Sequence, residues 1–182
     1  MGSPSERARA VLDLTLARPA TLGAGRLVCV DGPTGSGKTM LAAAVADLAG
    51  GATVVHTDQL IEGWGGLPGL ADAVGRLLDP LTRGATGRWR RWDWHAEAWA
   101  EWREVAPGGL LVLEGVGAWS SAVAPLVTVL TWVDAPREVR WRRGIDRDGD
   151  DFAPYWEQWA LEEAALFARE LTREHADLVV ET

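Results

Sequence analysis

The chain has 182 residues, of which 47% are apolar and 24% charged, and its formal net charge is −8. This length suits one domain with a single core and is too short for two full α/β domains. An acidic surface repels nucleic acids and anionic lipids, so we expect neither a nucleic-acid nor a membrane partner. The single cysteine, Cys29, excludes an intramolecular disulfide, and the lack of an apolar signal core favours a cytoplasmic location.

Apolar runs alternate with helical patterns along the chain, beginning with an amphipathic helix over 5–18. Short apolar runs predict strands buried on both faces of a parallel sheet at 27–31, 52–56, 110–114, 127–134 and 178–180. Helices are expected at 38–49, 70–79, from Pro136 onwards and at 154–174, with a charged turn over 146–151. Residues 84–95 form an imperfect strand pattern, and residues 96–104 look helical. This alternation predicts one α/β domain over 1–182.

A glycine-rich segment follows the first predicted strand. Gly32-Pro-Thr-Gly-Ser-Gly-Lys-Thr39 fits the pattern G-x-x-x-x-G-K-[ST] completely, between a buried strand and a helix. We expect its backbone N–H groups and the helix N-terminus to bind the phosphates of a nucleoside triphosphate. Lys38 would reach the β- and γ-phosphates, and the Thr39 hydroxyl would bind Mg²⁺. The expected nucleotide-binding residues are Gly32, Thr34, Gly35, Ser36, Gly37, Lys38 and Thr39.

Three carboxylates follow or end predicted strands, where ligands bind in such sheets. Asp58 could accept the proton of an attacking hydroxyl, or it could cap a turn. Glu114 ends the third strand and fits a role in holding Mg²⁺ through water, although a strand-end carboxylate can also cap a loop. Asp31, directly before the glycine-rich loop, could share the outer shell of the metal.

Arginines lie on one face of the helix after the fourth strand. Arg140, Arg143 and Arg147 are spaced by three and four residues, which places them together on a helical surface. Triphosphate oxygens would offset their mutual repulsion, and the arginines would stabilise the moving phosphoryl group. Alternatively, this is a solvated face paired with neighbouring aspartates.

These motifs resemble the uridine kinase-like branch of the P-loop kinases, within the nucleoside and nucleotide kinase group, over about residues 26–181. The segments that carry the resemblance are 30–39, 56–58, 113–116, 133–134 and 140–148. It implies a three-layer P-loop NTPase fold, with a five-stranded parallel sheet of order 2-3-1-4-5 and helices on both faces. It also implies a short Arg-rich lid over about 142–153 that closes over the phosphates of ATP-Mg²⁺, and Asp58 as the catalytic carboxylate.

The sequence departs from that family around the expected acceptor site, at about 58–102. Asp58 is followed by Gln-Leu-Ile instead of aromatic residues, and the lid lacks a further Arg-Gly-Arg. Trp64 and Trp94 could stack on a planar acceptor, Asp93 could hold a sugar hydroxyl, and Arg91 could hold an anionic group. The alternative is a Trp-rich core hairpin with solvated arginines.

The sequence therefore predicts an ATP-dependent small-molecule kinase in which Asp58 deprotonates an acceptor hydroxyl. Lys38, Arg143 and Arg147 would stabilise the transferred phosphoryl group. A nucleoside is the first expected acceptor, with a nucleotide, a sugar-like metabolite or a natural-product alcohol as alternatives. A non-catalytic ATP-binding regulatory module and a homodimer stay open at this stage.

Overall fold

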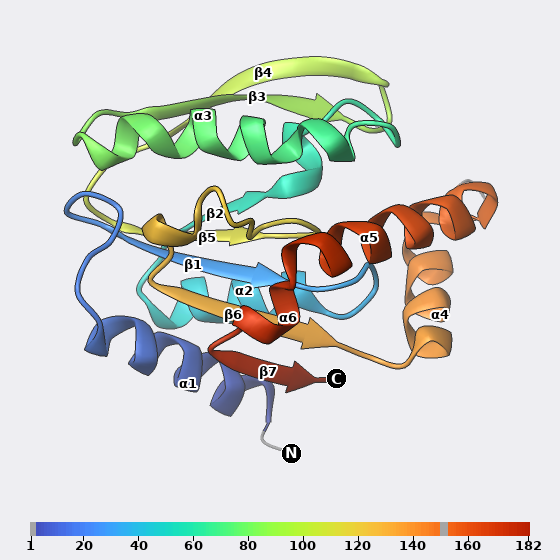
Figure 1. Ribbon diagram of the computed structural model, residues 1–182, viewed down its shortest axis with the longest axis horizontal. Coiled ribbons are helices and arrows are strands. Elements are labelled where there is room, and N and C mark those ends of the chain that lie inside the picture. The colour runs from blue at the N-terminus through green and yellow to red at the C-terminus, as the bar shows by residue number, and fades with distance from the viewer. Residues whose placement is uncertain (1–2, 150–152) are drawn as a thin grey trace.

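The computed structural model describes residues 3–149 and 153–182, so residues 150–152 of the expected lid lie outside the described residues. The main sheet contains β1 (Arg26–Asp31), β2 (Thr53–His56), β5 (Leu110–Glu114), β6 (Val129–Asp134) and β7 (Leu178–Glu181). All four pairings are parallel and the order is β2-β5-β1-β6-β7 (Figure 1). Numbered along the chain, this is the predicted order 2-3-1-4-5.

Both faces of the sheet are covered by helices, as the apolar strands require. Val28 and Val30 of β1 share a core with α1 (Pro4–Ala17) and α2 (Lys38–Leu48). The alternate residues Leu27 and Cys29 face the opposite core, which includes α3 (Leu70–Thr82) and α5 (Trp156–Glu170). The α/β three-layer prediction is confirmed.

The C-terminal helical pattern is interrupted near its end. Instead of one helix over 154–174, α5 stops before Leu171, which has a left-handed backbone (φ 54°), and α6 (Thr172–His175) follows. Within the described residues, short 3₁₀ helices cover Thr57–Leu60, Leu67–Gly69, Ala124–Leu126 and Ala153–Tyr155.

The helix predicted over 96–104 is wrong, because this segment is a strand. β3 (Gly87–Asp93) and β4 (Ala98–Val105) form an antiparallel hairpin, which stands with α3 above the β2 edge of the sheet in Figure 1. The Ala and Glu residues of β4 have a high helix propensity, but pairing with β3 outweighs it. This pairing includes cross-strand ion pairs such as Arg88–Glu104.

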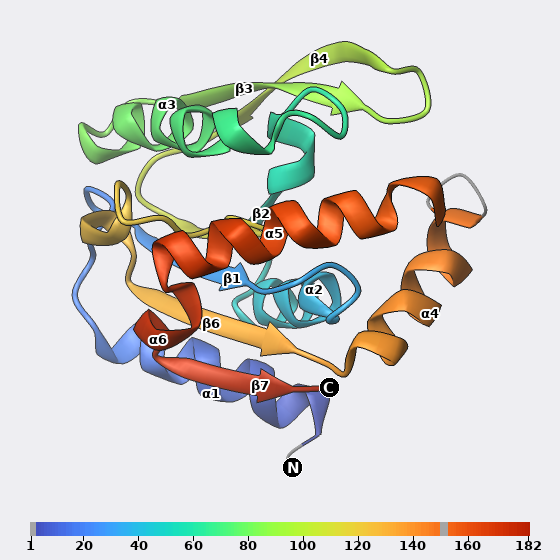
Figure 2. The ribbon, with the colours of Figure 1, turned by 45° about the vertical axis from the view of Figure 1, so that its right-hand side comes forward.

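The helix α4 (Arg137–Asp148) stands at the carboxyl ends of the strands, toward which the arrows of β1, β6 and β7 point (Figure 2). It continues through Asp146, so the charged turn predicted to begin there is wrong. Among the described side chains of α4, no large apolar one is buried. Polar contacts therefore contribute to its position, together with the edge contact between Trp141 and Trp156. Within the described residues, no helix combines the length and apolar character needed to cross a membrane.

Candidate functional site

The loop from Gly32 to Thr39 curls between β1 and α2, and its glycines are required there. Gly35 and Gly37 have φ of +78° and +96°, a region that L side chains rarely adopt. Gly37 is also the N-cap of α2, so no capping side chain covers the first N–H groups of that helix. The buried Ser36 hydroxyl has no hydrogen-bond partner in the described part of the chain. This donor-rich loop therefore fits an anion such as a triphosphate.

Lys38 lies inside this loop and is only 7% exposed. Its Nζ donates to the carbonyl oxygen of Pro33 at 2.9 Å. Burial lowers the pKa of Lys38, and the negative charges of Glu114, Glu163 and Asp31 oppose that shift. A desolvated ammonium aimed across the loop is the group expected to contact a phosphate oxygen.

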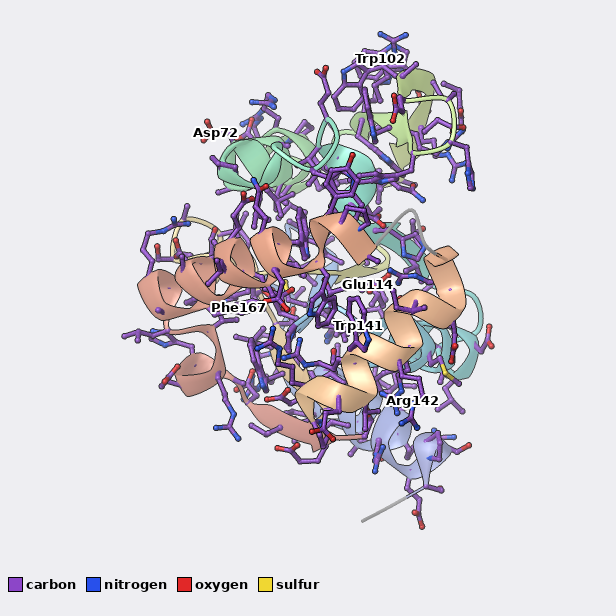
Figure 3. All side chains as sticks on the ribbon, turned by 90° about the vertical axis from the view of Figure 1, so that its right-hand side faces the viewer. Asp72, Trp102, Glu114, Trp141, Arg142 and Phe167 are labelled. Carbon is purple, nitrogen blue, oxygen red and sulfur yellow. The ribbon has the colours of Figure 1, made fainter. Side chains whose placement is uncertain are left out.

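A hydroxyl and a carboxylate meet beside the loop. Thr39 Oγ1 donates to Glu114 Oε1 at 3.1 Å, and Glu114 is 4% exposed. Glu114 lies between α4 and α5 when the molecule is viewed toward the carboxyl ends of the strands (Figure 3). Oxygen donors of these two kinds suit Mg²⁺, which keeps several waters when it is bound by one or two carboxylates and phosphates. The described residues include no group of three or more His, Cys, Asp or Glu side chains arranged for a metal ion.

His56, the last residue of β2, is a neighbour of this pair. Its Nδ1 hydrogen-bonds Glu114 Oε1, and this bond raises the pKa of His56, which burial opposes. The β2–β5 register pairs His56 directly with Glu114. The predicted strand order makes β2 and β5 neighbours, but only their register places His56 opposite Glu114.

Asp58 follows β2 in the first 3₁₀ turn (Thr57–Leu60). Its side chain is accessible to solvent, yet desolvation, followed by the charge of Glu114, raises its pKa. The positive charges of His56, Arg147 and Lys38 oppose this shift. A carboxylate that is both accessible and partly desolvated suits a general base.

The arginines of α4 reach the loop in different ways. Arg143 Nη1 donates to the Gly35 carbonyl at 3.3 Å and to Thr182 Oγ1 at 2.8 Å. Arg147 acts on the pKa of Asp58 through its charge, which places it within electrostatic range of the carboxylate. The structure thus brings both arginines to the loop region, and their contacts with a phosphoryl group stay predictions.

Aromatic rings from separate elements gather near Asp58. Trp94 Nε1 donates to the Asp58 carbonyl oxygen at 3.2 Å, and Trp94 and Trp64 are in edge contact at 5.1 Å between ring centroids. Trp64 also stacks on Tyr155 (5.0 Å, 9°) and contacts Trp159 edge-on. Two of the predicted acceptor-site tryptophans therefore do lie together beside Asp58.

Arg91 and Asp93 bond to each other within the hairpin. Arg91 donates to Asp93 Oδ2 at 2.9 Å and to Glu101 Oε1 at 2.9 Å. Asp93 Oδ1 accepts the backbone N–H groups of His95 and Ala96, which orders the turn between the strands. These contacts supply structural roles for both residues, and their contact with an acceptor stays a prediction.

Asp31 joins two loops through its carboxylate. Its carboxylate accepts the N–H groups of Gly32 (2.7 Å), Gly117 (3.0 Å) and Trp119 (2.9 Å), and it is fully buried. Burial raises the pKa of Asp31 to about 7, although the three backbone hydrogen bonds and the positive charge of Lys38 act to lower it. These contacts supply a structural role for Asp31, and its place in the outer shell of a metal stays a prediction.

A pH dependence of stability follows from Asp31. Its pKa is higher in the folded than in the unfolded chain, so between about pH 4 and 7 the folded state holds the extra proton. The contribution of Asp31 to the free energy of unfolding therefore falls as pH rises from about 4 to 7. The fall is at most about 1.4 kcal/mol per pH unit, and the contribution is constant above that range. Urea unfolding of the wild type and Asp31→Asn at pH 5, 6, 7 and 8 measures this. Parallel pH profiles for the two proteins would contradict the assignment.

Two solved structures share the fold over nearly their whole length. One, described as a possible uridine kinase from Bacillus stearothermophilus, aligns with a TM-score of 0.69 at 20% sequence identity, covering 96% of this chain and 97% of that one. Another, assigned as a fructose transport system kinase from Silicibacter sp. TM1040, aligns with a TM-score of 0.64 at 20% identity, covering 98% and 99%. No protein-family profile and no curated protein matches the sequence. At this identity the likeness establishes the fold, which this chain shares with the two structures over nearly its whole length.

Proposed function

We propose that the chain is an ATP-dependent kinase that phosphorylates a hydroxyl group of an uncharged small molecule, with a nucleoside as the first candidate. The observation that carries the proposal is the convergence of three features at the carboxyl ends of adjacent strands. These are the loop with Lys38 after β1, the base candidate Asp58 after β2, and the Thr39–Glu114 pair at the end of β5. The kinase names of the two structural neighbours support the same reaction class.

The residues divide the chemistry of phosphoryl transfer among them. Asp58 takes the proton of the acceptor hydroxyl as its oxygen forms a bond to the γ-phosphorus and the bond from that phosphorus to the bridging oxygen breaks, which leaves ADP. Lys38, with Arg143 and Arg147 from α4, stabilises the charge on the transferred group. Thr39 and Glu114 would hold Mg²⁺, which neutralises charge on the phosphate oxygens.

The charge of the β3–β4 hairpin favours an uncharged acceptor over a nucleotide. Each of its arginines has a partner within the hairpin, namely Glu104 for Arg88, the carbonyls of Trp99 and Ala100 for Arg90, Asp93 and Glu101 for Arg91, and Glu101 for Arg103. The four arginines are balanced by four carboxylates over 87–105. A phosphorylated acceptor would compete with these carboxylates for the arginines, whereas a hydroxyl compound would not.

The acceptor is identified by measuring ADP release from Mg²⁺-ATP across nucleosides, nucleoside monophosphates, sugars and aminocyclitols. We expect one uncharged acceptor to raise the rate well above the basal ATPase rate and to gain the mass of one phosphoryl group. Lys38→Ala should abolish both effects. If ATP binds but every acceptor leaves the rate at its basal value, the regulatory-module alternative is favoured. Preference for a nucleoside monophosphate would contradict the charge argument.

A further inference from the structure

One residue of the phosphate loop is held at all three of its polar atoms by the C-terminal helices. The Thr34 N–H donates to Glu163 Oε2 at 2.9 Å, and its carbonyl accepts from Arg140 Nη1 at 3.3 Å. Its hydroxyl accepts from Trp159 Nε1 at 2.7 Å. Thr34 thus attaches the loop to both α4 and α5.

Glu163 is the centre of this arrangement. It is 3% exposed, although it lies on the face of α5 that carries Trp156, Trp159 and Leu166. A buried carboxylate is costly unless it is paired and hydrogen-bonded. Here one oxygen accepts the Thr34 N–H and the other accepts Arg140 Nη1 at 3.2 Å. Apolar packing alone does not explain an acid at this position, but the attachment of the loop does.

The attachment also determines where α4 lies. Because α4 buries no large apolar side chain completely among its described residues, its polar contacts help to fix its position. Arg140 and Arg143 donate to the successive loop carbonyls of Thr34 and Gly35. The backbone of Gly35 lies so close to the Arg140 carbonyl that a Cβ there would collide with it. A shift of the loop would therefore move the arginines of α4 together with it.

We propose that Glu163 is a positioning residue that fixes the phosphate loop relative to the arginines of α4, so that both can bind the nucleotide. This inference rests on the proposed function, since it assumes that the loop holds ATP. It also changes the expected role of Thr34, whose N–H is occupied by Glu163 and which anchors the loop instead of contacting a phosphate. The charge of Glu163 acts on buried Lys38 as well, opposing the loss of its proton.

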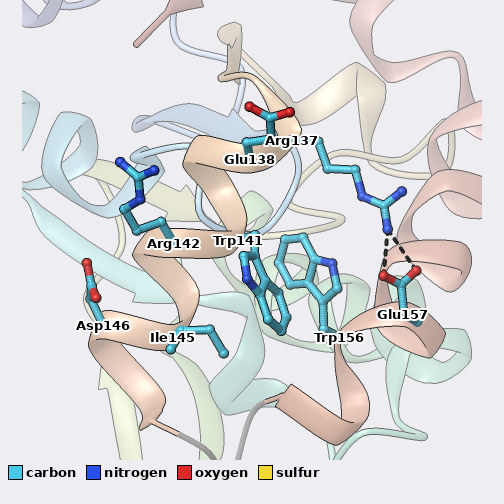
Figure 4. A pocket seen from close by; sticks show the side chains of 8 residues that line it. All are labelled: Arg137, Glu138, Trp141, Arg142, Ile145, Asp146, Trp156 and Glu157. Atoms are coloured by element: carbon cyan, nitrogen blue, oxygen red, sulfur yellow. Dashed lines mark hydrogen bonds and ion pairs between the residues drawn. The ribbon is translucent and has the colours of Figure 1, made fainter.

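The chain offers a matched control for the test. Arg137 and Glu157 form a second ion pair between α4 and α5, at 2.7 Å, on the exposed side. This pair lines a cavity of about 680 Å³ together with the edge-on tryptophans Trp141 and Trp156 (Figure 4). Glu157→Gln therefore removes the same chemistry between the same two helices without contacting the loop.

The experiment measures the Kd of Mg²⁺-ATP for the wild type, Glu163→Gln and Glu157→Gln, each at a temperature well below its own Tm. We expect Glu163→Gln to bind about tenfold more weakly, because Gln cannot satisfy the Thr34 N–H and Arg140 together as a carboxylate does. Glu157→Gln should bind within about twofold of the wild type. Where turnover is measurable, the KM for ATP should rise for Glu163→Gln while the KM for the acceptor stays constant.

Two outcomes separate the inference from the function on which it rests. Nucleotide affinity of Glu163→Gln equal to that of Glu157→Gln would overturn the positioning role and leave the kinase proposal intact. A wild-type chain that binds no nucleotide would overturn both. If Glu163→Gln does not fold, Arg140→Lys tests the other end, since an ammonium cannot reproduce the Arg140 contacts with Ala135, Thr34 and Glu163. It should then weaken Mg²⁺-ATP binding about threefold, and unchanged binding would count against the inference.

Discussion

Asp58→Asn is expected to lower the rate of phosphoryl transfer by about 10²–10⁴-fold, the usual contribution of a positioned general base. Asn is nearly the same size and cannot accept the proton of the acceptor. The Asp58 carbonyl that accepts from Trp94 is a backbone group, so the substitution leaves this contact in place. Affinity for Mg²⁺-ATP should change little, because the loop and the Thr39–Glu114 pair are untouched.

The comparison for Asp58→Asn is Asp72→Asn, an exposed carboxylate on α3 far from Glu114 in Figure 3. Single-turnover measurements with saturating ATP separate chemistry from product release. A variant at position 58 that turned over at the wild-type rate would remove Asp58 from the catalytic role. This result would favour the alternative that the chain is a non-catalytic ATP-binding regulatory module.

Gly32→Ala is expected to lower the free energy of unfolding by about 3 kcal/mol, because two effects combine at this position. The backbone φ of Gly32 is +141°, which side-chain-bearing residues rarely adopt, and a Cβ there would overlap the backbone carbonyl oxygen of Val133 in β6. That oxygen belongs to a buried strand and cannot move away as a flexible side chain could. For a chain of this length the change corresponds to a fall in Tm of about 6–12 °C.

Gly50→Ala measures the cost of a positive φ alone, without a steric contact of the added Cβ. Gly50 also has a positive φ, +81°, but nothing lies within 4 Å of an added Cβ. We expect a loss of about 1 kcal/mol from this variant in the same urea or thermal unfolding experiment. Equal destabilisation by the two substitutions would show that the contact with Val133 does not constrain the phosphate loop.

The sheet and the phosphate loop were predictable because their signals are local. Five apolar runs gave the strands, and the complete motif from Gly32 to Thr39 fixed the place of the loop between a strand and a helix. The strand over 98–105 was not predictable in this way. Its Ala and Glu residues favour a helix, and only pairing with β3, a tertiary contact, makes it a strand.

The sequence predicted which residues belong to the candidate site, but not most of the contacts between them. Asp58 and Glu114 follow from their places at strand ends, but the link from His56 to Glu114 needed the register of β2 against β5. The position of Glu163 in the sequence also indicates a buried role. It lies four residues after Trp159 on the apolar stripe of α5, where an acid has to find a buried partner.

The strand order has a consequence for the order in which the chain can fold. β1 and β2 are consecutive in sequence but not adjacent in the sheet, and both pair with β5. The register joins Arg26 to Leu110 and Thr53 to Leu111, so no two strands of the main sheet can pair before residues 110–114 have been synthesised. Such distant pairings slow folding and leave strand edges exposed for longer. A chain emerging from the ribosome can complete the β3–β4 hairpin first, and the phosphate loop gains its supporting sheet only afterwards.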